Sequence, residues 1–430
     1  MSQTKKWECL QKVGIIGVPF EKGQKKYGVS IAPAALRSAG LIEALKEIDN
    51  LDVKDYGDIE TGGPEQKLNV QNMDYLSMVS DCNKNLSDQV AKVLKDDRIA
   101  VTIGGDHSIG VGTVDGHCKV NEDMILIWVD AHADINTNKT SDSGSVHGMP
   151  VALLVKEFSN YWPYLPTWDW QELKFSIKSL GYIGLRSVDR YERLAIEKYN
   201  VPCFAMEDVE EHGIKKSILH VLKQLDPNNC RPIHVSFDID SLDSLEAPST
   251  GTPVRGGLSL REAVRLMEIV HATGRLRAID LVEINPAIGN ECDRKRTIEA
   301  GISILKAALG FSRRGTLMTM ITLANCLKPE TTDTIDDEAK TVISKYLDKI
   351  PDIEPQFVIH KGLSKVISQY FKGKISPLPL YKISVKLDRN PVLIPWTLSE
   401  SSNLKQDPSN KLKKNMKYYR YIPKRQTDKN

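Results

Sequence analysis

Short apolar runs recur along the chain, each followed by Gly, Asp or Asn and then by a helical pattern of apolar residues. Runs such as Met124–Val129 show no alternation with polar residues, which is typical of strands covered on both faces. Strands alternating with helices favour βαβ units, so the sequence predicts an α/β fold with a parallel sheet between helix layers. The predicted strands are Val13–Val18, Ile99–Ile103, Met124–Val129, Tyr182–Leu185, Ile233–Phe237 and Leu276–Val282.

Composition excludes several other classes of protein. The 430 residues are 41% hydrophobic and 27% charged with a net charge of +2, which is globular and gives no reason to expect nucleic acid as a partner. We see no apolar run long enough to cross a bilayer and no apolar signal core at the start, so no membrane partner is expected. The seven cysteines form no CxxC pair, which favours free thiols and a cytoplasmic location.

Three of the predicted strands end in motifs rich in Asp and His. Ligands of parallel α/β sheets bind outside the carboxyl ends of the strands, so these positions are the first place to look for a site. A single Asp after a strand most often caps a helix or makes a turn, but three coinciding motifs make that interpretation insufficient. The motifs occupy residues 104–108 (GGDHS), 130–136 (DAHADIN) and 236–240 (SFDID).

The spacing of these acids predicts a binuclear metal site. Extended chain alternates its faces, so Asp130, His132 and Asp134 point one way, and Asp238 and Asp240 share a face of their own strand end. Buried carboxylates need a counter-charge, and four of them balance two divalent ions. Oxygen-rich coordination with imidazole and without thiolate favours Mn²⁺ over structural zinc, so we expect two Mn²⁺ per subunit.

With these motifs the chain resembles the arginases of the ureohydrolase family, over about residues 13–314. The resemblance implies a three-layer α/β/α sandwich with a mostly parallel central sheet, and a homotrimer in which Arg313 matches an interface position. It also implies that Asp130 and Asp238 bridge two metals. One metal would be bound by His107, Asp130, Asp134 and Asp238, and the other by Asp130, His132, Asp238 and Asp240.

The same resemblance implies hydrolysis of L-arginine to L-ornithine and urea. A water bridging two metals loses a proton near neutral pH, and the resulting hydroxide attacks the guanidinium carbon. Glu283 would orient the guanidinium, because a carboxylate matches its planar fork. Asp134 would accept a proton from the hydroxide, and His147 would shuttle a proton to the departing amine.

Selection of arginine over its decarboxylated analogue agmatine requires groups for the α-carboxylate and the α-amine. By resemblance, Asn136 and Ser143 lie on the carboxylate side, Asp189 and Glu192 on the amine side, and Thr252 completes the pocket. Ser187 and Ser145 depart from the residues that arginases commonly have near these loops. Two alternatives stay open: a ureohydrolase for another guanidino compound such as agmatine, and an inactive arginase-like binding protein.

The chain changes character near residue 328. Residues 330–354 hold eight acidic residues against three lysines with helical apolar spacing, which predicts an amphipathic helix. Residues 401–430 hold nine Lys or Arg against two Asp, which favours a solvated, disordered tail. We therefore expect a catalytic domain over residues 1–328 and a C-terminal extension over 329–430.

Overall fold

The computed structural model describes residues 10–311 except 67, 69 and 163, together with 313, 384–387 and 390–393. The chain divides into two compact units, Met1–Thr316 and Leu317–Asn430. In the second unit, the described residues form one antiparallel pair of strands, β9 (Ser384–Leu387) and β10 (Asn390–Leu393). The predicted domain boundary, the amphipathic helix over 330–354 and the basic tail over 401–430 lie outside the described residues.

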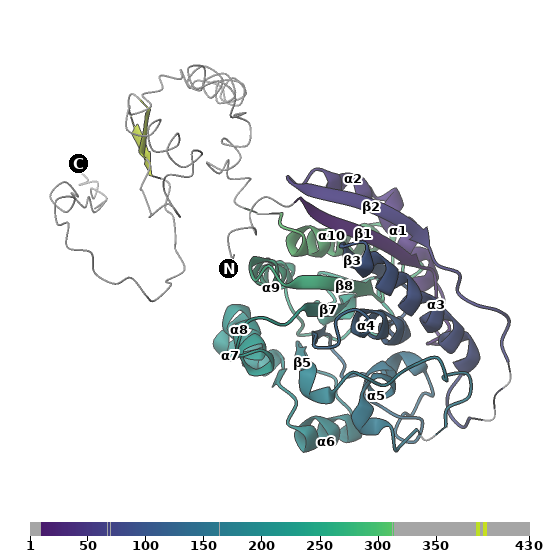
Figure 1. The fold of residues 1–430 in the computed structure, drawn as a ribbon. Helices are drawn as coiled ribbons and strands as arrows, with labels where there is room; N and C mark the ends of the chain where they lie inside the picture. Colours follow the sequence, from purple (N-terminus) through teal and green to yellow (C-terminus); the bar gives the residue numbers. More distant parts are fainter. Residues whose placement is uncertain are drawn as a thin grey trace. The chain divides into compact units, whose positions relative to one another are not determined.

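An eight-stranded sheet runs through the first unit (Figure 1), and all its paired strands are parallel. The strand order is β2-β1-β3-β8-β7-β4-β5-β6. The six predicted runs are strands whose ends differ from the prediction by at most two residues, and β2 and β6 join the sheet at its edges. The strands are β1 (Gln11–Val18), β2 (Leu51–Asp58), β3 (Ile99–Gly104), β4 (Ile125–Val129), β5 (Leu180–Ile183), β6 (Cys203–Phe204), β7 (Ile233–Asp238) and β8 (Leu276–Val282).

Helices cover both faces of the sheet, because the central strands are apolar on both sides. In β4, Ile127 and Val129 pack into one core, whereas Leu126 and Trp128 pack into the other. The first core is closed by α1 (Ala32–Ser38), α2 (Leu41–Lys46), α7 (Met206–His212), α8 (Ile214–Leu225), α9 (Leu260–Ala272) and α10 (Glu291–Ala308). The second is closed by α3 (Leu76–Lys95), α4 (Gly110–Cys118), α5 (Pro150–Leu154) and α6 (Arg190–Tyr199). The predicted α/β/α sandwich is confirmed.

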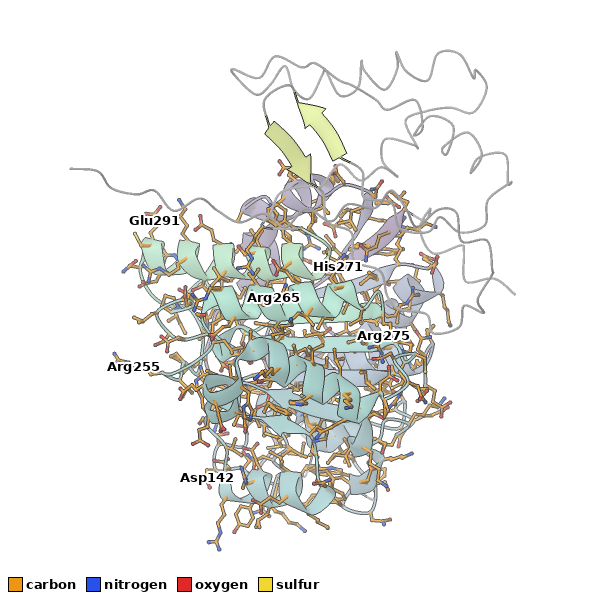
Figure 2. The ribbon with its side chains drawn as sticks, turned by 90° about the vertical axis from the view of Figure 1, so that its left-hand side faces the viewer. Asp142, Arg255, Arg265, His271, Arg275 and Glu291 are labelled. Atoms are coloured by element: carbon orange, nitrogen blue, oxygen red, sulfur yellow. The ribbon has the colours of Figure 1, made fainter. Side chains whose placement is uncertain are left out.

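Single turns of 3₁₀ helix connect several of these elements. They are η1 (Val29–Ile31), η2 (His107–Ile109), η3 (Val146–Gly148), η4 (Lys156–Phe158), η5 (Ile177–Ser179) and η6 (Ile239–Ser241). Figure 2 shows α10, which begins at Glu291, running beside α9, which carries Arg265 and His271. No helix in the described part of the chain has the length and apolarity needed to cross a membrane. The five described cysteines are free thiols, as predicted.

Candidate metal centre and active site

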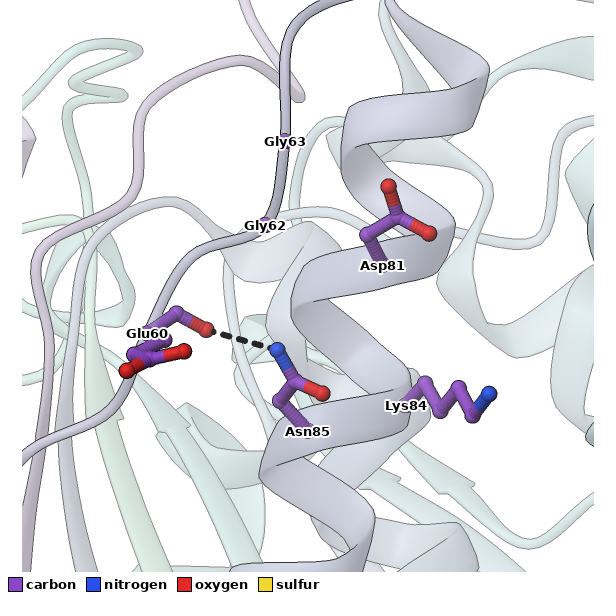
Figure 3. A pocket seen from close by; sticks show the side chains of 6 residues that line it. All are labelled: Glu60, Gly62, Gly63, Asp81, Lys84 and Asn85. Carbon is purple, nitrogen blue, oxygen red and sulfur yellow. Dashed lines mark hydrogen bonds between the residues drawn. The ribbon is translucent and has the colours of Figure 1, made fainter.

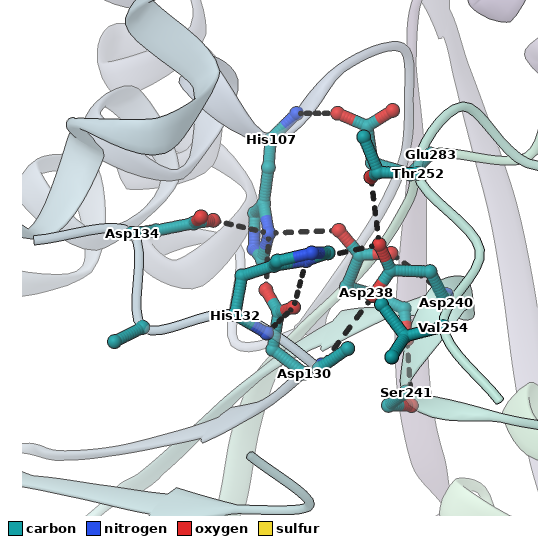
Figure 4. Close-up of polar contacts among 12 residues, drawn as sticks. His107, Asp130, His132, Asp134, Asp238, Asp240, Ser241, Thr252, Val254 and Glu283 are labelled. Atoms are coloured by element: carbon teal, nitrogen blue, oxygen red, sulfur yellow. Dashed lines mark hydrogen bonds and ion pairs between the residues drawn. The ribbon is translucent and has the colours of Figure 1, made fainter. Parts of the chain in front are cut away.

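The polar strand-end motifs meet at the middle of the sheet. Strands β3, β8, β7 and β4 are consecutive neighbours, and their carboxyl ends lead into the loops that carry the predicted metal ligands and Glu283. Figure 4 shows these side chains pointing toward one another. All six predicted ligands therefore come together at the carboxyl ends of the central strands, although His107 and Asp240 are 133 positions apart in the sequence.

Local hydrogen bonds turn the chain where each strand ends. The Asp106 carboxylate accepts from the backbone N–H of Ser108 at 3.0 Å, which starts η2 and presents His107 to the site. Asp238 accepts in the same way from the N–H of Asp240 at 2.8 Å at the start of η6. Asp134 and Glu283 have φ of 51° and 63°, a left-handed conformation that non-glycine residues seldom adopt outside functional sites.

The first group of candidate ligands surrounds His107. Its Nδ1 lies 3.0 Å from Asp130 Oδ2, 3.1 Å from Asp134 Oδ2 and 3.1 Å from Asp238 Oδ2. All four side chains are buried or nearly so. Ligand atoms of His107, Asp130 and Asp238 all lie within 4.8 Å of one another, so one ion has the donors it needs there.

The second group shares Asp130 with the first. Nδ1 of His132 lies 3.4 Å from Asp130 Oδ1 and 3.2 Å from Asp240 Oδ2, and these three residues also offer ligand atoms within 4.8 Å of one another. Asp130 thus turns one oxygen toward each group. This is the arrangement expected of a carboxylate that bridges two metals.

The carboxylates repel one another strongly in their buried positions. Burial and the charge of Asp130 raise the pKa of Asp134 to about 6. Burial and the charges of Asp240 and Asp130 raise the pKa of Asp238 well above its usual range. Burial opposes ionisation of Asp130 as well, but the neighbouring His107 and His132 rings outweigh it and lower the pKa of Asp130. Four ionised carboxylates so close together require cations beside them.

The donor set fits a pair of divalent cations. Nδ1 of His107 is buried and makes no hydrogen bond with suitable geometry, although three carboxylate oxygens surround it. A lone pair that faces carboxylates is repulsive unless a cation lies between them. Carboxylate oxygens and imidazole nitrogens, without a thiolate, are the donors that Mn²⁺ accepts readily.

Glu283 and His147 form a second polar unit beside the candidate metal ligands. Glu283 Oε1 lies 2.9 Å from Nδ1 of His147 and accepts from the backbone N–H of His107 at 2.9 Å. Burial opposes protonation of the His147 ring, but the charge of Glu283 outweighs it and raises the pKa of His147 to about 9. Burial likewise opposes ionisation of Glu283, yet His147 lowers its pKa below the usual range. The two side chains behave as an ion pair at neutral pH.

Comparison with known proteins identifies similar sequences and structures. The family model described as "Arginase family" matches residues 11–310. The chain belongs to the arginase family. Arginase-1 of Sus scrofa is 41% identical over 306 residues, which are 71% of this chain and 95% of that protein. The native structure of Bacillus caldovelox arginase has 32% identity and a TM-score of 0.64, and covers 70% of this chain and 99% of that one. The structure of Entamoeba histolytica arginase with L-ornithine has 33% identity and a TM-score of 0.60, and covers 69% and 99%.

Most residues predicted to bind substrate lie beside the metal ligands of this arginase-family chain. Asn136 Nδ2 donates to Asp189 Oδ2 at 2.8 Å, and the buried Glu192 accepts from the N–H of Asp189 at 2.9 Å. Thr252 Oγ1 donates to Asp240 Oδ2 at 2.9 Å. Within the described chain, no hydrogen bond joins Ser143 to another predicted substrate residue; its side chain contacts Ser141 and Ser145.

Sequence reasoning missed several side chains that contact the site of this arginase-family protein, Gln24 and Trp128 among them. Gln24, in the loop after β1, donates to Glu283 Oε2 at 2.6 Å. Trp128 stacks on the His107 ring with centroids 4.0 Å apart and donates to Asp130 Oδ2 at 3.0 Å. Gln24 could have been predicted as a candidate, because it is a polar residue in the loop after β1, an interior strand of the sheet. Trp128 could not, because it is one apolar residue within an apolar run.

A separate shallow pocket lies between the loop after β2 and helix α3 (Figure 3). It shares no residue with the site of this arginase-family chain. Asn85 Nδ2 donates there to the carbonyl oxygen of Glu60 at 3.0 Å. The lining residues are Glu60, Gly62, Gly63, Asp81, Lys84 and Asn85.

Proposed function

We propose that this protein is a manganese-dependent arginase that hydrolyses L-arginine to L-ornithine and urea. The convergence of His107, His132 and four Asp side chains around two overlapping ligand groups carries the proposal. Two divalent ions, when bound there, supply a hydroxide nucleophile at neutral pH. In the same proposal the protein is cytoplasmic, as the cysteine pattern favours, and homotrimeric, as its resemblance to the family implies.

Glu283 is suited to orient the guanidinium carbon. Its carboxylate is fixed by His147 and His107 at one oxygen and by Gln24 at the other. Each carboxylate oxygen has two lone pairs, so Oε2 keeps acceptor capacity for the planar guanidinium fork. A carboxylate fixed in this way needs little reorganisation when the substrate binds.

His147 is suited to protonate the departing amine. Its Nδ1 is engaged by Glu283, which leaves Nε2 for proton exchange, and 20% of the side chain is exposed. The pKa of about 9 keeps the ring in its acid form at neutral pH. Asp134, whose pKa is raised by burial and by Asp130, is the carboxylate suited to accept a proton near the candidate metal ligands.

A urea assay with arginine and agmatine side by side tests the proposed substrate. Asn136, Asp189 and Glu192 are polar groups that an arginine α-carboxylate and α-amine would satisfy, so we expect kcat/KM for arginine to exceed that for agmatine by at least about 100-fold. Equal or better turnover of agmatine would overturn the specificity. Two bound metals without urea release from either substrate would favour the inactive binding protein.

Metal content tests the ligand assignment. Asp238 is a proposed bridge, so Asp238→Ala should reduce the two Mn²⁺ per chain that we expect for the wild type. Elemental analysis of purified protein measures this, with Asp142→Ala, an exposed site in Figure 2, as the matched control. Two ions retained per chain in Asp238→Ala would refute the assignment.

A further inference from the structure

A buried polar cluster lies behind the metal ligands, between α4 and the sheet. It interrupts a layer that is otherwise packed with apolar side chains such as Val114 and Ala278. Its members come from β3, α4, β7 and β8, and none of them is more than 1% exposed. They are Thr102, Thr113, His117, His234, Ser236 and Asp280. Burial of a polar group costs free energy unless the group is hydrogen-bonded, so the hydrogen bonds within this cluster decide its cost.

Asp280 is the common acceptor of this cluster. Its Oδ2 accepts from Ser236 Oγ at 3.1 Å and from Thr113 Oγ1 at 2.6 Å, and it lies 3.1 Å from His234 Nε2. Its Oδ1 has no hydrogen-bond partner among the described residues. Two hydroxyl donors and one imidazole nitrogen therefore converge on a single carboxylate oxygen.

Ser236 connects Asp280 to the metal ligand His107. Ser236 Oγ lies 3.0 Å from Nε2 of His107. A hydroxyl group has one proton to donate, and Ser236 Oγ donates it to Asp280 Oδ2. Because Ser236 gives its proton to Asp280, its oxygen faces His107 with lone pairs only. Nε2 of His107 must then carry the hydrogen of this contact.

This direction of hydrogen bonding decides which ring nitrogen of His107 is available to a metal. A neutral imidazole with hydrogen on Nε2 has an unprotonated Nδ1, and a metal requires such a lone pair. Nδ1 is the nitrogen that faces Asp130, Asp134 and Asp238. If Ser236 instead donated to Nε2, the neutral ring would carry its hydrogen on Nδ1 and could not bind the ion.

We propose that Asp280, acting through Ser236, is a positioning residue that fixes the Nε2–H tautomer of His107 and so presents Nδ1 to the metal. The inference rests on the proposed metal site. It assigns a role to two residues that lie outside the predicted ligand set. Stacking of His107 on Trp128, with ring planes 9° apart, fixes the ring's plane but leaves the position of its hydrogen to Ser236.

Three variants of the full chain test the proposal by their equilibrium affinity for Mn²⁺ after chelator stripping. Ser236→Ala removes the acceptor for Nε2–H, and Asp280→Leu frees the Ser236 hydroxyl to donate to His107. Each should weaken Mn²⁺ binding by about 10- to 100-fold, as loss of an outer hydrogen-bond partner does. Because Asp280 affects His107 only through Ser236, the double variant should bind Mn²⁺ as weakly as Ser236→Ala and no more weakly.

Two further variants separate positioning from packing. Asp280→Asn keeps a carbonyl oxygen for the hydroxyl donors Ser236 and Thr113, so it should restore most of the affinity lost in Asp280→Leu. Thr113→Val removes a donor to the same oxygen that does not lead to His107, so it should keep wild-type affinity. Melting temperatures of the metal-free proteins report any purely structural cost.

The outcomes distinguish this inference from the proposed function. A wild type that fails to bind Mn²⁺ overturns both, whereas a wild type that binds Mn²⁺ alongside a folded Ser236→Ala of equal affinity overturns only the positioning role. Weakening by Thr113→Val as large as that by Ser236→Ala would also overturn it. If Asp280→Leu does not fold, Ser236→Ala still decides the result.

Discussion

His147 is the residue on which the proposed proton transfer depends. Its ring contacts Glu283, and within the described chain it makes no hydrogen bond to any of the six candidate metal ligands. His147→Ala should therefore lower kcat by on the order of 10- to 10³-fold while Mn²⁺ content stays unchanged. Steady-state urea release with elemental analysis measures both, and His212→Ala on the surface is the control. An unchanged rate would remove the shuttle from the mechanism.

The His147–Glu283 pair also predicts a pH dependence. Glu283 raises the pKa of His147 from 6.5 to about 9, so the acid form persists through neutral pH and is lost as pH rises through about 9. The stabilisation from this ion pair follows the same sign: it is fully present below about 6.5 and disappears above about 9. We expect kcat/KM to fall on the alkaline side of about 9, and His147→Asn to lack that fall. An identical alkaline limb in His147→Asn would assign it to another group.

At the scale of elements, the central strands were predictable and the edge strands were not. β4 is buried along its whole length and is a continuous apolar run, whereas β7 is equally buried but alternates apolar residues with His234, Ser236 and Asp238. β2 is mostly exposed beyond Leu51 and mixes Asp and Lys with apolar residues, and β6 has only two residues. Edge strands bury less surface, and their sequences therefore carry a weaker signal.

The sharp turns after the central strands bring separate loops into contact, and Gly105 shows how closely. A Cβ on Gly105 would overlap the backbone carbonyl of Phe20 in the loop after β1. The Gly105 N–H also donates to Val18 O at 2.9 Å, and its carbonyl accepts from the N–H of Glu283 at 2.9 Å. The residue has no freedom to move aside.

Gly105→Ala should therefore lower both stability and metal content. Overpacking typically costs about 1–3 kcal/mol, and we expect a loss of that size here, because displacement of the neighbouring chain would also move Glu283 and His107. Thermal unfolding and elemental analysis measure these effects. Gly63→Ala, where an added Cβ meets no atom within 4 Å, is the control. A variant as stable and as metal-loaded as Gly63→Ala would contradict this account.

At the scale of the whole molecule, the candidate site was predictable where it follows from topology alone. Parallel strands end at the same edge of a sheet, so the strand-end positions of His107, Asp130 and Asp238 in the sequence are enough to assign them to one place. The Ser236–Asp280 and Gln24–Glu283 hydrogen bonds depend on which strands and loops become neighbours. The sequence of a buried strand does not show which strands and loops will become its neighbours, so these contacts could not be predicted.

The extent of the site along the chain predicts that the C-terminal extension is dispensable for catalysis. The candidate catalytic and metal-binding residues lie between His107 and Glu283, and the family match ends at residue 310. The α9–α10 layer closes the core of this unit through buried residues such as Ile304 and Leu305. Deletion of residues 331–430 should therefore leave Mn²⁺ content and kcat close to those of the full chain. A truncated protein that folds, as judged by circular dichroism and thermal unfolding, and yet releases no urea would show that the extension contributes to the site or to its assembly.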